Sequence, residues 1–217
     1  MEAFRSDKYM EKVLIVGAGG FGRELLAWCR QHPEHGCKWT VVGFLDDTTN
    51  TVAGDVRVVG RIADYVPQGE KILLGLGMPA TKHKVVEQLR LKRAVFHEFI
   101  HPSAIIGERV SLGIGTIVCP GAVLTSDVKL GEFVTINICA SVGHDAVVGD
   151  YSTLSGHCDV TGHAKVGNRV FMGSHAVITP KCVVGDDAVI GAGAVVFSTV
   201  RPGTTMIGNP SRQLLGI

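Results

Sequence analysis

Two stretches of this chain carry residue types suited to proton transfer and to phosphate binding. The first is the pair His144-Asp145, with Gly162 eighteen residues further on. An imidazole can accept a proton from an attacking amine or hydroxyl, and a neighbouring carboxylate can orient the ring. A glycine beside the ring leaves room and a backbone N–H for a thioester oxygen. The alternative is that His144 is a polar turn residue without a catalytic role.

The second stretch is Gly17-x-Gly19-x-x-Gly22, which follows an apolar strand pattern and precedes a helical one. Its glycines permit a tight turn, and the N–H groups at the start of a helix bind phosphate. Asp46 follows at the distance of a ribose-binding acid. The pattern therefore fits NAD, but the α/β region from residue 12 to about residue 98 has fewer than ninety residues, too few for both halves of a dinucleotide fold. A nucleoside diphosphate, such as the head of a nucleotide-sugar, is favoured; a turn without ligand is the third possibility.

Further histidines suggest a metal site. His157 and His175 are eighteen residues apart, and Cys139 lies eighteen residues before them. With a third histidine from another subunit, such a column can hold zinc. Stacked histidines are more often solvated turn residues or part of a subunit interface. The roles of His157, His163 and His175 stay open.

The second half of the chain repeats every six residues. From Ile106 to Val196, every sixth residue is Leu, Ile, Val or Met; the residue two positions earlier is small, and glycine often follows. Neither a helix nor an ordinary strand has this period, whereas a hexapeptide parallel β-helix does. Three hexads make one coil, so residues eighteen apart stack. His144 is then expected beneath Gly162, and Asp145 beneath His163.

Three regions follow from these patterns. Residues 1–98 are expected to form a small Rossmann-like α/β domain, because strand and helix patterns alternate there. Residues 99–200 are expected to form the left-handed β-helix, and residues 201–217 a capping tail. The elements predicted in the first region are strands at Lys12–Val16, Trp39–Leu45, Val56–Val59 and Lys71–Leu76, a helix after Gly22, and a helix at about Ala80–Leu91.

Composition excludes several functions. Lys and Arg total 21 against 20 Asp and Glu, and no basic or acidic run suggests nucleic acid or a basic partner. The first ten residues lack a signal-peptide core, and the apolar run Val13–Gly20 is too short to span a bilayer. We expect a cytoplasmic protein without membrane contact. Met10 is an alternative start, which would make residues 1–9 an extension, and whether they are native stays open. Cys158 and Cys182 belong to the inward small-residue column, and no cysteine pair suggests a zinc ribbon.

The chain resembles bacterial nucleotide-sugar acetyltransferases of the sialic acid O-acetyltransferase type, nearest to the N-acetyltransferases of nucleotide-linked 4-amino-sugars. The resemblance covers the chain from Glu11 onwards. It rests on the stretches VLIVGAGGFGRELL, GFLDD, LGLGM, INICASVGHDAVVGDYSTLSG and IGNPSRQL.

The resemblance implies a role for individual residues. His144 is expected to act as the general base, tuned by Asp145. The nucleotide-sugar is expected to contact Gly19, Gly20, Phe21, Asp46, Asp47 and Gly77. Acetyl-CoA is expected between two β-helices of a homotrimer, near Gly162, Ser174 and Ala192, with no metal. The chain departs from the family at Phe21 and Thr153, where members often carry histidine.

We therefore expect transfer of an acetyl group from acetyl-CoA to the amine of a nucleotide-linked 4-amino-sugar. The nucleotide (UDP, GDP or dTDP), the sugar and the glycan pathway stay open. O-acetylation of a sugar hydroxyl is the close alternative. A zinc lyase of the carbonic anhydrase kind, using His157 and His175, and a non-catalytic nucleotide-sensing scaffold are the more distant ones.

Overall fold

The computed structural model describes residues 10–48 and 55–215; the predicted extension at residues 1–9 and the last two tail residues lie outside this part. The chain begins with a five-stranded parallel sheet in the order β3-β2-β1-β4-β5. Its elements are β1 (Glu11–Val16), α1 (Gly20–Cys29), β2 (Trp39–Leu45), β3 (Val58–Gly60), β4 (Lys71–Leu74), α2 (Pro79–Leu91) and β5 (Val95–Phe96). The predicted strands and helices are present. The fourth strand ends two residues earlier than predicted, because Gly75 and Leu76 leave the sheet and line a pocket.

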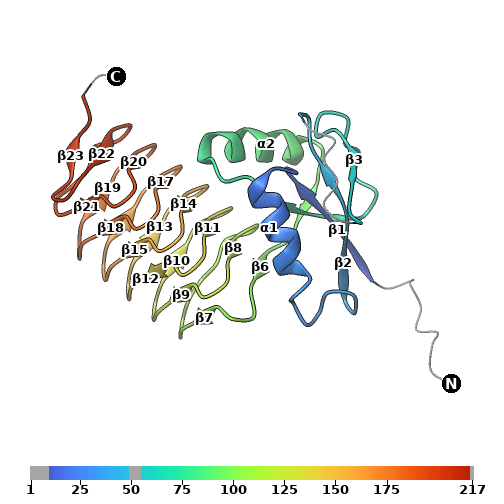
Figure 1. Cartoon of the computed structure of the whole chain (residues 1–217), viewed down its shortest axis with the longest axis horizontal. Coiled ribbons are helices and arrows are strands. Elements are labelled where there is room, and N and C mark those ends of the chain that lie inside the picture. Colours follow the sequence, from blue (N-terminus) through green and yellow to red (C-terminus); the bar gives the residue numbers. More distant parts are fainter. Residues whose placement is uncertain (1–9, 49–54, 216–217) are drawn as a thin grey trace.

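The two helices cover opposite faces of this sheet. Val13 and Ile15 of β1 belong to the same buried cluster as Leu25 of α1. Leu14 and Val16, which point the other way, share a cluster with Val86 of α2. Alternate side chains of a strand face opposite sides of its sheet, so β1 is buried on both faces. Figure 1 shows this α/β unit beside the first coils of a solenoid.

The rest of the chain is a parallel β-helix with three sheets. We call them the first sheet (β6, β8, β11, β14, β17, β20, β22, β23), the second (β7, β9, β12, β15, β18, β21) and the third (β10, β13, β16, β19). The strands are β6 (Phe99–Ile100), β7 (Ile105–Ile106), β8 (Ile117–Val118), β9 (Val123–Leu124), β10 (Lys129–Leu130), β11 (Thr135–Ile136), β12 (Ser141–Val142), β13 (Val147–Val148), β14 (Thr153–Leu154), β15 (Asp159–Val160), β16 (Lys165–Val166), β17 (Phe171–Met172), β18 (Val177–Ile178), β19 (Val183–Val184), β20 (Val189–Ile190), β21 (Val195–Val196), β22 (Thr205–Ile207) and β23 (Arg212–Gln213).

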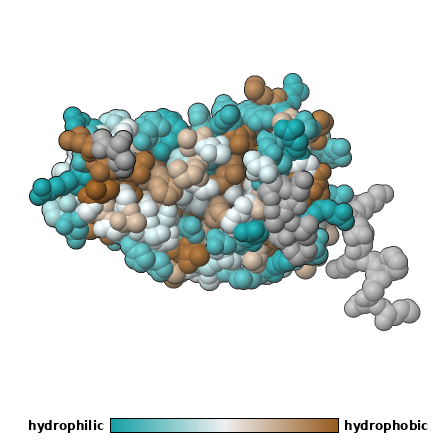
Figure 2. Space-filling model, turned by 45° about the horizontal axis from the view of Figure 1, so that its top comes forward, coloured by the Kyte–Doolittle hydropathy of each residue, from teal (hydrophilic) through white to brown (hydrophobic). Residues whose placement is uncertain are grey.

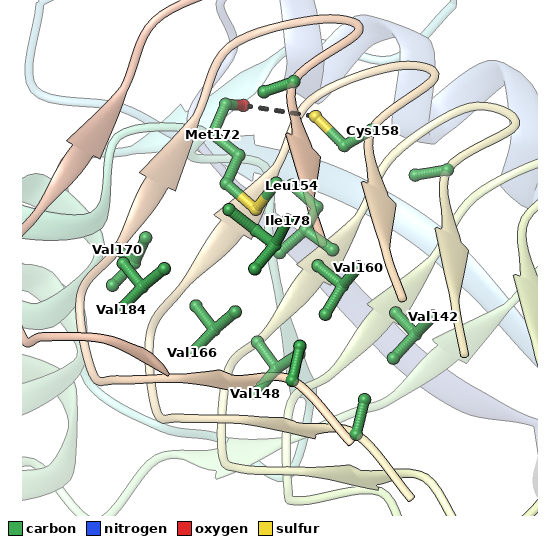
Figure 3. Close-up of a cluster of buried hydrophobic side chains, with 14 of the residues drawn as sticks. Val142, Val148, Leu154, Cys158, Val160, Val166, Val170, Met172, Ile178 and Val184 are labelled. Atoms are coloured by element: carbon green, nitrogen blue, oxygen red, sulfur yellow. Dashed lines mark hydrogen bonds between the residues drawn. The ribbon is translucent and has the colours of Figure 1, made fainter. Parts of the chain in front are cut away.

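The coil length predicted from the hexads is confirmed. Ser141 pairs with Asp159, and Thr135 with Thr153, so residues eighteen apart are neighbours. Every large aliphatic residue of the repeat from Val118 to Val196 is at most 5% exposed. Figure 3 shows the members of this set from Val142 to Val184 meeting in the middle of the coils. Cys158 is also buried and points its Sγ at the Gly173 carbonyl, 3.1 Å away. The predicted inward position of that cysteine is therefore confirmed.

The α/β unit packs on the outside of the β-helix through two apolar clusters, and the interior of the coils forms a third. Phe99 and Ile117 of the solenoid belong to the cluster around α1, whereas Phe133 and Tyr151 belong to the cluster around α2. Both helices therefore pack against the solenoid on the side of its first sheet.

The tail extends the solenoid by a short hairpin. β22 pairs in parallel with β20, and β23 runs antiparallel to β22. The tail thus lies on the last coil of the first sheet. Among the described residues, the structure contains no helix long and apolar enough to cross a membrane.

Candidate active site

The pair His144-Asp145 lies on the turn between β12 and β13, at the corner where the second sheet meets the third. Asp145 has a left-handed backbone, with φ of +59°. This conformation brings the two adjacent side chains together, and His144 Nδ1 lies 2.9 Å from Asp145 Oδ2. A carboxylate on Nδ1 favours the tautomer that carries its proton there and leaves Nε2 free to accept one. Both side chains are about half exposed.

Gly162 is adjacent to the His144 ring on the next coil, as the eighteen-residue spacing predicts. A Cβ atom at Gly162 would lie 2.5 Å from His144 Nε2. Only glycine therefore leaves the ring in its present position, with Nε2 next to the Gly162 backbone.

His163 belongs to the same group. Its Nε2 atom lies 3.8 Å from Asp145 Oδ2, and its ring meets the His144 ring edge-on with centroids 5.0 Å apart. Ligand-type atoms of His144, Asp145 and His163 all lie within 4.8 Å of one another. Within the described part of the chain, this is the group of three that has the spacing of a metal site.

His157 and His175, the residues of the zinc hypothesis, lie at a different corner, where the first sheet meets the second. Their rings stack at 4.8 Å with an interplanar angle of 17°. The structure brings no third ligand to this pair among the residues it describes.

A separate pocket of about 290 Å³ lies at the carboxyl ends of β1, β2 and β4. This is the edge of a parallel sheet where ligands bind, at the point where the strand order reverses. Its lining residues are Gly17, Gly19, Gly20, Phe21, Asp46, Gly75, Leu76, Gly77, Met78 and Thr81. The predicted residues Gly19, Gly20, Phe21, Asp46 and Gly77 are therefore together in one pocket.

Two helices begin at this pocket. The N-cap residues are Gly19 for α1 and Met78 for α2, and neither helix has a side-chain cap. Their first N–H groups and the positive ends of both helix dipoles suit an anion. At Gly20, an added Cβ would meet no atom within 4 Å, so the backbone there is open to a ligand.

Asp46 and Asp47, both expected to contact the nucleotide-sugar, lie in different surroundings. Asp46 supports the glycine-rich loop: its Oδ2 accepts the Ala18 N–H at 2.8 Å, and its Oδ1 accepts the Thr48 N–H at 2.7 Å. Asp47 is not among the lining residues; its Oδ1 accepts the Ala63 N–H at 3.3 Å and lies 3.8 Å from Arg61.

The residues expected near acetyl-CoA are divided between two corners of the solenoid. Ser174 and Ala192 stack on one another at the corner between the first and second sheets, whereas Gly162 is at the His144 corner. Thr153 is 3% exposed, and its hydroxyl lies 2.9 Å from Lys82 Nζ. The Thr153 side chain is therefore hydrogen-bonded to α2 of the α/β unit.

Lys82 is a residue that sequence reasoning missed. It is 1% exposed, and its Nζ donates to the Phe133 carbonyl at 2.8 Å and to the hydroxyls of Thr153 and Thr135 at 2.9 and 3.0 Å, with the Ser152 carbonyl 3.3 Å away. Burial lowers its pKa to about 7. The available signal was its spacing from the buried residues Val85, Val86 and Leu89, which places all four on one helix face.

Comparisons with known proteins agree with both halves of the fold. Residues 12–89 match the family model described as the PglD N-terminal domain, and residues 163–198 match the bacterial transferase hexapeptide model of six repeats. A search of curated protein sequences finds no match.

Several solved structures are similar over 94% of this chain. PerB from Caulobacter crescentus, in complex with CoA and GDP-perosamine, is 29% identical with a TM-score of 0.85, over 97% of its length. The acetyltransferase domain of PglB from Neisseria gonorrhoeae FA1090, in complex with acetyl coenzyme A, is 25% identical with a TM-score of 0.86, over its whole length. WeeI from Acinetobacter baumannii AYE is 26% identical with a TM-score of 0.84, also over its whole length.

The predicted fold, an α/β unit followed by a left-handed parallel β-helix of hexapeptide repeats, is confirmed. The matches show an acyltransferase built on hexapeptide repeats. Within that class it is an acetyltransferase with a PglD-type N-terminal domain, built like the nucleotide-sugar acetyltransferases.

Proposed function

We propose that this enzyme transfers the acetyl group of acetyl-CoA to the amine of a nucleotide-linked amino-sugar, with His144 as the general base. The observation that carries the proposal is the contact between His144 Nδ1 and Asp145 Oδ2, which leaves Nε2 available beside Gly162. Support comes also from PerB, whose structure contains CoA and GDP-perosamine, and from PglB, whose structure contains acetyl coenzyme A.

In this mechanism the neutral amine attacks the carbonyl carbon of the thioester. The new C–N bond gives a tetrahedral intermediate, and its nitrogen releases a proton to His144 Nε2. Asp145 stabilises the imidazolium that forms. The C–S bond then breaks, and the CoA sulfur takes the proton from His144. We assign the stabilisation of the oxyanion to backbone N–H near Gly162.

The pocket between the two helix starts is our proposed nucleotide site. Both uncapped helix N-termini are at the pocket, and they would stabilise the negative charge of a diphosphate bound there. The open backbone at Gly19 and Gly20 permits close approach of the phosphate groups. Phe21 and Met78 give the same pocket an apolar wall. Because the Asp46 carboxylate already supports the loop, we assign it a structural role as well as contact with the nucleotide.

The proposed nucleotide pocket and the proposed base lie on opposite sides of the solenoid. The pocket lies beside the first sheet, against which α2 packs, whereas His144 lies at the opposite corner, between the second and third sheets. The expected acetyl-CoA residues are likewise divided between two corners. We therefore propose the homotrimer, in which the pocket of one copy faces His144 of another. Exposed apolar side chains on the solenoid, including Ile105, Ile138 and Phe197, are available for such contacts; Figure 2 shows apolar patches over the coils.

The decisive assay follows release of free CoA thiol from acetyl-CoA across UDP-, GDP- and dTDP-linked 4-amino-sugars. Release with one acceptor supports the proposal and identifies the nucleotide and the sugar. If no amine is acetylated but a sugar hydroxyl is, the enzyme is an O-acetyltransferase. If no acceptor in either group reacts, the proposal is wrong.

A further inference from the structure

The Asp145 carboxylate lies between two imidazole rings. Its Oδ2 atom is 2.9 Å from His144 Nδ1 and 3.8 Å from His163 Nε2. The rings themselves are nearly perpendicular, at 88°, which is a favourable edge-to-face arrangement. His163 thus contacts both members of the proposed catalytic pair.

The β-helix determines where His163 lies. Its backbone N–H donates to the His144 carbonyl at 2.9 Å, and its φ of +60° repeats the left-handed turn of Asp145 on the coil before. The preceding acid in the same column, Asp127, is held by two 2.7 Å hydrogen bonds from Arg109. Each acid of this column therefore has a basic side chain from a neighbouring coil beside it, and for Asp145 that side chain is His163.

We propose that His163 is a positioning residue for acetyl transfer, which keeps the Asp145 carboxylate turned towards His144. The inference rests on the proposed function. A half-exposed carboxylate on a turn is free to rotate into solvent. The His163 ring on its far side restricts this rotation, and its edge also limits rotation of the His144 ring. With Asp145 in place, the tautomer of His144 with a free Nε2 is favoured.

The chain contains a matched control for this role. His157 and His175 have the same left-handed backbone, with φ of +61° and +62°, and are exposed. Their N–H groups make the same inter-coil hydrogen bonds, from His157 to Ile138 and from His175 to Gly156. Their rings stack on each other instead of contacting the catalytic pair. If the mere removal of a histidine from such a turn lowers activity, alanine at His157 or His175 should therefore lower it as well.

The kinetic test uses the full-length enzyme with acetyl-CoA and the acceptor found in the panel assay. His163→Ala is expected to lower kcat about tenfold with little change in KM, because transition-state geometry changes and substrate contacts do not. His163→Gln, whose amide can donate to the carboxylate, should recover most of the loss. His157→Ala should keep the wild-type kcat, and its KM for acetyl-CoA is measured separately because Ser174 lies at the same corner. In an Asp145→Asn background, His163→Ala should have no further effect. An equal loss in both backgrounds, or no loss at all, would overturn the proposal.

A second measurement does not depend on acetyl transfer. Nitrogen NMR of labelled protein distinguishes a protonated from an unprotonated ring nitrogen, and is recorded at a pH where the His144 ring is neutral. In wild type the proton should lie on Nδ1 of His144, whereas in His163→Ala and Asp145→Asn the tautomer with the proton on Nε2 should gain population. An unchanged tautomer of His144 in His163→Ala refutes the positioning role. If no acceptor is ever acetylated while the tautomer shifts as expected, the proposed function fails and the positioning role is retained.

Discussion

Lys82 Nζ lies 2.9 Å from Thr153 Oγ1 and 3.0 Å from Thr135 Oγ1. The two threonines are neighbours on β11 and β14, and they begin and end the coil on which His144 lies. Lys82 is in the first turn of α2, directly after the pocket residue Thr81. A single buried amine therefore joins the wall of the proposed nucleotide pocket to the coil that carries the proposed base.

The buried amine should make stability depend on pH. Folding lowers the pKa of Lys82 from its ordinary 10.5 to about 7 because of burial. Between these values the unfolded chain binds a proton that the folded chain does not. The free energy of unfolding should therefore rise by about 1 kcal/mol per pH unit from pH 7 towards 10.5, and this dependence disappears below pH 7, where Lys82 is charged in both states.

Urea unfolding of wild type and Lys82→Met at several pH values between 7 and about 8.5 tests this slope. The variant should lack the rise that Lys82 contributes. Lys84→Met, on the exposed side of the same helix, should keep the wild-type slope. If the free energies of unfolding of wild type and Lys82→Met change with pH in parallel, Lys82 does not titrate in this range.

His144→Gln should lower kcat by a factor on the order of 10²–10⁴, the range of general acid–base catalysis. Glutamine fits the exposed turn but cannot accept a proton at neutral pH. His157→Gln is the matched control and should keep wild-type turnover. Steady-state thiol release measures both, and near-normal turnover of His144→Gln would remove the residue from the mechanism.

Gly162→Ala should reduce activity without unfolding the protein. The new Cβ would lie 2.5 Å from His144 Nε2, and the ring can move away because it is exposed. We expect kcat to fall by up to about a hundredfold, as for misplaced catalytic groups, with a stability change of about 0.5 kcal/mol or less.

Gly156→Ala is the control for that substitution. Its Cβ would come only 3.5 Å from the Ile138 carbonyl, which is an ordinary contact, and the residue lies at the His157 corner. Thermal unfolding and kcat should both stay close to wild type, with the KM for acetyl-CoA measured separately because Ser174 lies on the neighbouring coil. Equal activity of the two alanine variants would contradict the placement of the base beside Gly162.

Alanine at two glycines of the glycine-rich loop should change different properties, the KM at Gly20 and the stability at Gly22. Gly20→Ala places a Cβ in the open pocket, so the KM for the acceptor should rise while stability changes by less than about 1 kcal/mol. Gly22→Ala places a Cβ 1.8 Å from the Gly17 carbonyl oxygen, and should cost about 3 kcal/mol or more. Kinetics and urea unfolding of both variants separate the ligand-facing glycine from the packing glycine.

Much of the fold was predictable because the sequence pattern is periodic. The six-residue repeat required short stacked strands, and the eighteen-residue coil placed Gly162 beside His144 and His163 beside Asp145. The alternation of strands and helices before the repeat was equally readable, and the glycine-rich loop indicated the pocket. Such patterns work because burial and backbone geometry act locally and recur in every coil.

Other features depend on the three-dimensional packing. The distance between His144 and Asp145 required the left-handed turn at Asp145, and adjacency in sequence does not specify it. Asp46 was expected to contact the ligand, yet its carboxylate also holds the loop. Lys82 meets partners from 51 to 71 residues away. No local pattern encodes which surface of the solenoid a helix will cover, so the environment of such a side chain is decided only when the α/β unit and the coils pack together.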